Sequence, residues 1–158
     1  MPLSFGKSSP KDMLAKARRD LTRLEAAEKA QDGDEISDSL FDLAVALTSI
    51  RDWLQKHPSL VLPKATVAQY SAASIALESF RDIANAGKHR VITRYLPKTS
   101  DVLASAPSSS LAVLGTRSSG GYPRLKIIST DGARHRAVDV AHTAIRDWQA
   151  FMDKHGVL

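Results

Sequence analysis

Three side chains of complementary chemistry recur four residues apart in one segment of the chain, namely Arg81, Asn85 and His89. If the segment is helical they form a single stripe, because residues four apart lie on the same face of a helix. Arginine can bind a phosphate, asparagine can orient a group by hydrogen bonds, and histidine can act as base or acid near neutral pH. Cleavage of RNA by its own 2′-hydroxyl needs these functions and no metal. We therefore take Arg81, Asn85 and His89 as candidate catalytic residues of a metal-independent ribonuclease.

The segment that contains Arg81, Asp82 and His89 resembles the HEPN superfamily of small bacterial helical bundles. Its members carry an arginine, usually followed by a polar residue, and a histidine further along, near the end of a bundle helix. This resemblance implies an RNA-directed protein that forms a homodimer, with ribonuclease activity in a toxin or antiphage system. The segment is also similar to an Arg-Asp, Asn, Lys-His signature of small bacterial proteins, in which the preceding helix ends in Asp-Trp as at Asp52-Trp53. That second resemblance implies a family and no activity.

Two other interpretations of the same segment stay open. In a structural interpretation, Arg81 and Asp82 form a pair on a helix surface, and Lys88, His89 and Arg90 are cations that the helix dipole favours near a C-terminus. In a second interpretation, the segment binds nucleic acid without cleaving it. The sequence therefore supports a non-catalytic module that binds nucleic acid or protein as the alternative to a ribonuclease.

The charge of the chain is unevenly distributed. The formal net charge is +5, and between residues 88 and 136 the only acids are Asp101 and Asp131. The cations of this block are Lys88, Arg90, Arg94, Lys98, Arg117, Arg124, Lys126, Arg134 and Arg136. Such a block suggests RNA or another polyanion as partner, because binding releases the counterions of the polyanion. The alternative is a solvated surface that keeps the protein soluble.

The candidate nucleic-acid-binding residues fall into two groups. One group follows the catalytic candidates and consists of Lys88, Arg90 and Arg94. The other group lies on predicted strands and consists of Arg124, Lys126, Arg134 and Arg136. Because alternate residues of a strand point to the same side, the second group can form a basic face suited to backbone phosphates.

The helices and strands predicted from the sequence indicate an α+β fold that is mostly α, and these elements must position the candidate residues. We expect a bundle of about four helices with a small antiparallel β-meander before the last helix. A single domain over 1–158 would contain a flexible N-terminus over 1–10, a three-helix bundle over 11–90, a loop over 97–110, a β-meander over 111–137 and a C-terminal helix over 138–155. The loop is predicted from two prolines among many serines and alanines.

Capping signals predict the helix ends. Ser9, followed by Pro10 and Asp12, predicts the start of the first helix, and Gly33 lies just past its end. The strongest apolar stripe, over 36–54, predicts a second helix that ends before Pro58. The last helix is expected to close near Gly156.

The third helix is predicted from a capping box. Thr66 and Gln69 have the spacing of such a box, so we expect one continuous helix from there to about Ala86. Gly87 can supply its C-cap, and a helix that continues through Gly87 to His89 is the alternative.

Three strands are predicted after the loop, over 111–116, 125–130 and 133–136. Asp131-Gly132 between the last two is a strong signal for a two-residue hairpin turn, in which both turn residues have positive φ.

Composition excludes several classes of protein. The chain has 158 residues, 43% of them hydrophobic, which is typical of one folded domain. The absence of cysteine excludes a disulfide framework, a thiolate metal site and a cysteine nucleophile. No two histidines have the spacing of a helical metal site, so we expect no metal and no cofactor. Without a signal peptide or a long apolar run, we expect a cytoplasmic protein that does not bind membranes.

Overall fold

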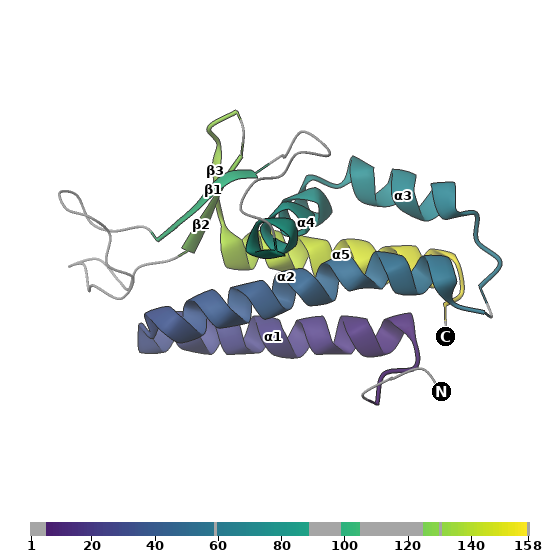
Figure 1. The fold of residues 1–158 in the computed structure, drawn as a ribbon, viewed down its shortest axis with the longest axis horizontal. Helices are drawn as coiled ribbons and strands as arrows, with labels where there is room; N and C mark the ends of the chain where they lie inside the picture. The colour runs from purple at the N-terminus through teal and green to yellow at the C-terminus, as the bar shows by residue number, and fades with distance from the viewer. Residues whose placement is uncertain (1–5, 59, 89–98, 105–124, 130, 158) are drawn as a thin grey trace.

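A computed structural model describes residues 6–58, 60–88, 99–104, 125–129 and 131–157. These residues form five helices and a three-stranded antiparallel sheet (Figure 1). The elements are α1 (Pro10–Ala30), α2 (Gly33–Lys56), α3 (Lys64–Ala73), α4 (Ile75–Lys88), β1 (Thr99–Ala104), β2 (Leu125–Ser129), β3 (Arg134–Arg136) and α5 (Ala137–Lys154). The α+β, mostly α class is therefore confirmed, with one helix more than expected.

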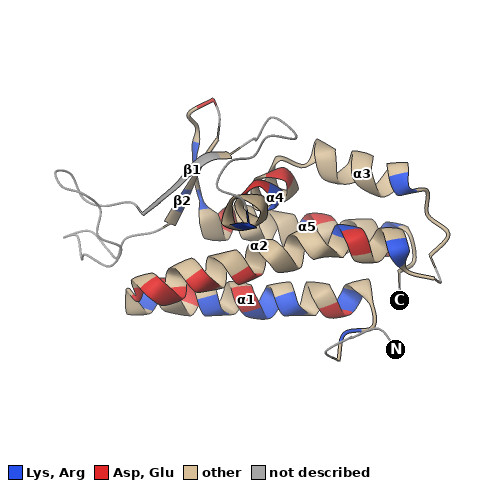
Figure 2. Ribbon diagram, viewed as in Figure 1, with Lys and Arg blue, Asp and Glu red and all other residues tan. Residues whose placement is uncertain are grey.

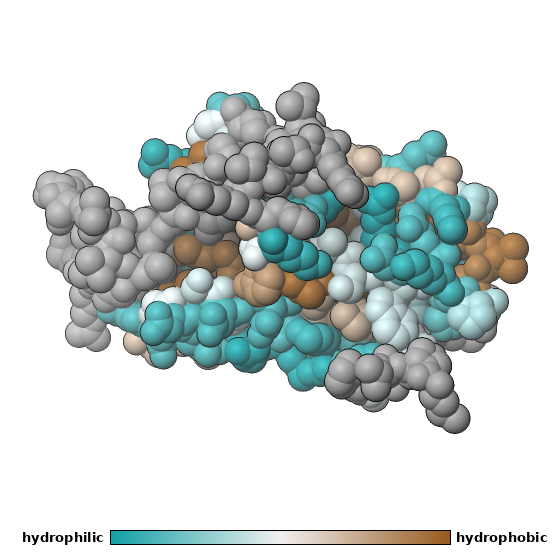
Figure 3. Space-filling view, in the orientation of Figure 1, coloured by the Kyte–Doolittle hydropathy of each residue, from teal (hydrophilic) through white to brown (hydrophobic). Residues whose placement is uncertain are grey.

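The three long helices form the base of the fold. α1 and α2 lie side by side along the long axis of the molecule, and α5 packs against both (Figure 1). α4 crosses α2 and α5, and is seen nearly along its axis in Figure 1, while α3 contacts α2 and α4. The sheet, in the order β1-β2-β3, packs against α5 at the end where that helix begins. Hydrophilic residues line the outer edge of α1 and α2 (Figure 3), as expected for amphipathic helices.

One apolar core joins the helices to the sheet. Trp148 of α5 is 1% exposed, and its indole N–H donates a 3.0 Å hydrogen bond to the carbonyl oxygen of Leu47. Phe80 of α4 is fully buried in the same cluster, which also contains Leu125 and Ile127 of β2. The sheet thus depends on the helices for its apolar contacts.

The first two helices follow their predicted capping signals, except at their junction. The side chain of Ser9 accepts the N–H of Asp12, and the Asp12 carboxylate accepts the N–H of Ser9, so the predicted start of α1 is confirmed. A hydrogen bond from the N–H of Ser8 is the main reason why the pKa of Asp12 is lowered. Gly33 lies just past the end of α1, as predicted, and it is itself the first residue of α2. Gln31 adopts the left-handed conformation (φ 59°), and Asp32 caps α2.

The predicted third helix is two helices. Its expected capping box at Thr66 is wrong, because the first turn already begins at Lys64 and the N–H of Thr66 donates to the carbonyl oxygen of Pro63. The break lies at Ser74, which has an extended backbone. Its hydroxyl oxygen accepts the N–H of Leu77, and its O–H donates a 2.6 Å hydrogen bond to a carboxylate oxygen of Asp147 in α5. A serine that competes for backbone N–H groups in this way ends one helix and begins the next.

α3 is attached to α5 mainly through Tyr70. Its hydroxyl donates a 2.7 Å hydrogen bond to the carbonyl oxygen of Asp147, and its ring packs 4.8 Å from that of Phe151. Partial burial, followed by the nearby charge of Asp147, raises the pKa of Tyr70. Both the hydroxyl and the ring therefore contribute to the contact between α3 and α5.

The sheet differs from the predicted meander in its first strand. β1 lies within 97–110, where we predicted a loop, and the predicted strand over 111–116 lies outside the described residues. β1 is short and polar at its start, so its strand conformation depends on pairing with β2, which local sequence does not reveal. The strands on either side of Asp131-Gly132 are confirmed as β2 and β3.

The turn between β2 and β3 is longer than predicted. Gly132 has a positive φ (84°), but Asp131, where we expected one as well, does not. The N–H of Gly132 donates to the carbonyl oxygen of Ser129, and a carboxylate oxygen of Asp131 accepts the N–H of Ala133. This pattern fits a three-residue loop with glycine at its left-handed position.

Candidate functional site

Arg81 lies in α4 between two buried carboxylates. Its guanidinium is 2.6 Å from Glu78 Oε2 and 3.5 Å from Asp82 Oδ1. The side chain of Arg81 is 22% exposed, while those of Glu78 and Asp82 are 7% and 2% exposed. A buried carboxylate without its cation is strongly unfavourable, so the fold holds Arg81 in place as the partner of these two acids.

Asp82 connects α4 to the sheet. One of its carboxylate oxygens faces Arg81, and the other accepts the backbone N–H of Thr99, the first residue of β1, at 2.9 Å. The pair Arg81–Asp82, predicted as an alternative to be a surface pair, is thus part of the interior, and it positions the first strand of the sheet.

The cavity that Arg81 lines is small. It has a volume of about 30 Å³ and is lined by Leu47, Thr48, Arg51, Ser71, Leu77, Glu78, Arg81 and Trp148. A volume of this size holds a water molecule. It has no room for a nucleotide.

α4 continues through Gly87 instead of ending before it. Of the two alternatives, a C-cap at Gly87 and a helix that continues through it, the structure shows the second, since the helix extends to Lys88. Gly87 fits there because it has no side chain: a Cβ at this position would overlap the ring of Phe41 in α2, at 2.7 Å from its Cδ2 atom. Asn85 lies one turn after Arg81 on this helix, and Lys88 is exposed at its end.

Several candidate residues are not placed. His89, Arg90, Arg94 and Arg124 lie outside the described residues. The structure therefore brings Arg81 and Asn85 onto one helix and leaves the position of the candidate base or acid open.

The register of the hairpin places its described cations on one face. Lys126 of β2 pairs directly with Arg136 of β3, and Ile128 pairs with Arg134. Because alternate residues of a strand share a face, Lys126, Arg134 and Arg136 lie on one side of the hairpin, and Leu125 and Ile127, which join the core, lie on the other. We call Lys126, Arg134 and Arg136 the basic face; blue residues mark it in Figure 2.

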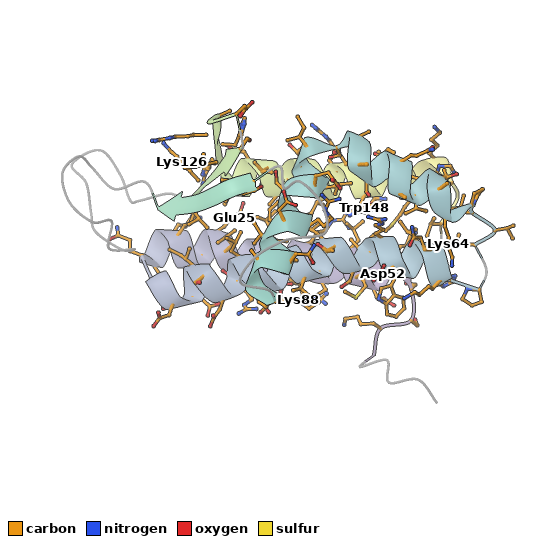
Figure 4. The ribbon with its side chains drawn as sticks, turned by 45° about the horizontal axis from the view of Figure 1, so that its top comes forward. Glu25, Asp52, Lys64, Lys88, Lys126 and Trp148 are labelled. Carbon is orange, nitrogen blue, oxygen red and sulfur yellow. The ribbon has the colours of Figure 1, made fainter. Side chains whose placement is uncertain are left out.

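Lys88 does not belong to this surface. Figure 4 shows Lys88 and Lys126 well apart, on opposite sides of α2. Lys88, the described member of the first predicted nucleic-acid-binding group, thus lies apart from the second group.

Arg136 is engaged inside the protein as well. It lies 3.2 Å from Glu28 Oε2 of α1, and Glu28 Oε1 accepts the N–H of Leu125 at 3.0 Å. Glu28 is 2% exposed. This single carboxylate joins the end of α1 to both strands of the hairpin.

Sequence reasoning missed Glu28, although a signal was available. Glu28 follows Leu24 by four residues, which places an acid on the apolar stripe of α1. A carboxylate on a buried stripe needs a cation or N–H donors, so its position alone indicates such a partner.

A groove opens between α4, the hairpin and the first turns of α5. Its volume is about 480 Å³, and it is lined by Ile75, Ala76, Ser79, Ile127, Arg134, His135, Arg136, Asp139, Val140 and Thr143. Arg134 and Arg136 belong both to this groove and to the basic face. Elements from three parts of the chain form this groove, and sequence reasoning did not anticipate it.

The described residues contain no group of three or more His, Asp or Glu side chains arranged to hold a metal ion. Within the same residues, no helix combines the length and the apolar character needed to span a membrane. Comparison with protein-family models, curated proteins and solved structures finds no match for this chain.

Proposed function

We propose that this protein binds RNA through the basic face of its hairpin. The observation that carries the proposal is the strand register, which puts Lys126, Arg134 and Arg136 on one side of two adjacent strands. Alternate residues of a strand are about 6.6 Å apart, so the cations can contact successive phosphates of an extended strand. Arg134 is exposed, and among the described residues no carboxylate forms an ion pair with it.

The remaining charge of the protein supports the same partner. Acidic residues gather on the first half of α2 (Figure 2), at Asp32, Asp34, Glu35, Asp38 and Asp42, whereas the chain from 88 to 136 is strongly basic. An uneven field of this kind attracts a polyanion to one side of a protein and repels it from another. RNA is also the substrate class that the resemblance around Arg81 implies.

The experiment is salt-dependent binding of a labelled single-stranded RNA of mixed sequence, followed by fluorescence anisotropy. The test variant is Lys126→Ala with Arg134→Ala; Arg136 is kept because it also holds Glu28. The control is Lys11→Ala with Arg19→Ala, which removes two exposed cations from α1. We expect the test variant to lower the slope of log affinity against log salt by about 1.4, because each lost phosphate contact on a single strand contributes about 0.7. Equal slopes for test and control, or no binding by the wild type at low salt, would overturn the proposal.

A metal-independent ribonuclease is the second candidate function. The observation that favours it is the continuation of α4 through Gly87, which keeps Arg81 and Asn85 on a helix that extends to the residue before His89. The ion pairs of Arg81 with Glu78 and Asp82 argue against it, because a phosphate would have to displace a buried carboxylate. Incubation of the same RNA in EDTA with wild type and with His89→Ala tests whether the protein cleaves RNA without a metal and whether cleavage needs His89. Cleavage that the variant loses while it still binds RNA supports catalysis, and absence of cleavage by the wild type removes this candidate.

A further inference from the structure

The groove beside the basic face has the size of a ligand site. Its volume of about 480 Å³ lies within the range of roughly 300 to 1,000 Å³ that small-molecule sites occupy. It lies between the first half of α4, the inner side of the hairpin and the first half of α5. The residues that line the groove determine which kind of ligand it can bind.

The floor of the groove is apolar. Ile127 and Ala76, from β2 and α4, are buried and lie beneath it, and Val140 of α5 packs against the same core. Ile75 lies at the margin and is 69% exposed, which is unusual for a large apolar side chain among the described residues. These side chains offer a surface for a flat apolar group.

Polar groups lie along the walls. Ser79 of α4 is 2% exposed and lines the groove. Across the groove, the hydroxyl of Thr143 donates to the carbonyl oxygen of Asp139, and its oxygen can still accept a hydrogen bond. The carboxylate of Asp139 is 69% exposed and can accept hydrogen bonds from a ligand. A ligand that fits both floor and walls therefore has an apolar face and a polar edge.

The hairpin supplies an aromatic ring and a cation at the rim. His135 pairs directly with Ile127, so it lies on the inner side of the hairpin, and it is exposed where the groove opens. Its neighbour Arg134 lines the groove and also belongs to the basic face. A ligand in the groove would thus lie within reach of the same arginine that we propose contacts an RNA phosphate.

We propose that this groove accepts one unpaired nucleotide of the bound RNA. The base lies on the floor formed by Ile127 and Val140 and stacks on His135, its polar edge faces Ser79 and Thr143, and its phosphate is bound by Arg134. Single-stranded RNA is commonly recognised in this way, by bases that leave the strand and stack on protein side chains. A fatty acid would fit the floor but would make no use of the polar groups of the walls. The inference rests on the proposed RNA binding and adds a preference for unpaired strands.

The test compares single-stranded RNA with a duplex of the same sequence. In Thr143→Trp the indole fills the groove from α5 without removing a charge, and Ala150→Trp adds the same side chain at an exposed position of α5 outside the groove. We expect Thr143→Trp to weaken binding of the single strand between about fivefold and a hundredfold, the range expected for loss of one stacked base. We expect its salt slope and its affinity for the duplex to remain those of Ala150→Trp.

A second groove variant, His135→Ala, tests the same inference in case Thr143→Trp does not fold. His135→Ala removes the exposed ring at the rim, and we expect it to weaken the single-stranded complex selectively as well. Circular dichroism shows whether each variant is folded. If RNA binds with the expected salt dependence but both groove variants bind the single strand like Ala150→Trp, the groove inference is wrong and the proposed function stands. If the wild type binds no RNA at low salt, both fall together.

Discussion

Arg81 is a phosphate-binding residue by type, but its neighbours decide what its charge does. Its position three residues after Glu78 and next to Asp82 is visible in the sequence, and so is the chance of ion pairs between them. The burial of both acids is not visible there, because it depends on the packing of distant elements, such as the start of β1 against Asp82. The sequence therefore shows that polar residues are concentrated in this segment, but it does not distinguish an interior ion-pair group from an exposed catalytic one.

Tyr70→Phe tests a single side chain. The variant loses the hydrogen bond to the carbonyl oxygen of Asp147 and keeps the ring contacts, so we expect it to lower the free energy of unfolding by about 1 kcal/mol near neutral pH. The pKa of Tyr70 is raised in the folded protein, so its contribution is complete below the ordinary value of 10.0 and is lost as the pH rises through the raised pKa. The difference between wild type and variant should therefore shrink above pH 10.

Urea unfolding of both proteins at neutral pH and above pH 10 measures this difference. Other tyrosines and lysines titrate in the same range, but their effects cancel between wild type and variant. A difference that stays constant across this range would show that the Tyr70 hydroxyl does not favour its protonated form in the fold.

At the scale of elements, the sequence predicted helices better than their boundaries. The cap at Ser9 could be predicted because its signals lie within one turn of chain. The break at Ser74 could not, because Ser74 also needs Asp147, which is distant in sequence, as its partner. β1 was missed for the same reason, since a short strand is stabilised by the strand beside it. Errors thus occurred where distant parts of the chain determine the local conformation.

Glu28→Gln tests the attachment of the hairpin to α1. The amide oxygen can still accept the N–H of Leu125, but the partly buried Arg136 loses its main counter-charge. We expect a loss of about 2 to 3 kcal/mol in the free energy of unfolding, somewhat below that for a fully buried pair. Urea denaturation gives the loss, and hydrogen exchange at the amide of Leu125 locates it.

The control is Glu35→Gln, which weakens an exposed ion pair with Arg23. It should cost less than about 1 kcal/mol, as is usual for ion pairs on the surface. Equal losses in the two variants would mean that Glu28 does not hold the hairpin as described.

At the scale of the whole molecule, helices and sheet share one core. Leu125 and Ile127 of β2 belong to the same buried cluster as Trp148 of α5. The expectation of a single domain over 1–158 then makes a clear prediction, that the protein unfolds in one cooperative step. Far-ultraviolet circular dichroism and tryptophan fluorescence should give coincident urea transitions with the same midpoint. Separate midpoints would indicate that secondary structure and the packing around the tryptophans of α2 and α5 are lost in different steps, so that the protein is not one cooperative unit.

Only part of the candidate site could be predicted from the sequence, because the site is formed by distant elements. Alternation along β2 and β3 predicted that Lys126, Arg134 and Arg136 share a face, and the register agrees with it. The groove beside them could not be predicted, because its walls come from α4, the hairpin and α5. Local periodicity determines which side of a strand a residue occupies, whereas a cavity depends on the packing of distant elements.

The contact between Gly87 and Phe41 links two positions that are 46 residues apart in the chain. Any side chain at position 87 would overlap the phenyl ring where it now lies, so the partly exposed ring of Phe41 would have to turn aside or be replaced by a smaller side chain. A relative with alanine or serine at position 87 should carry a smaller residue than phenylalanine at position 41, and one that keeps phenylalanine should keep glycine. Covariation of these two positions among relatives would therefore report the close approach of α2 and α4 at their crossing.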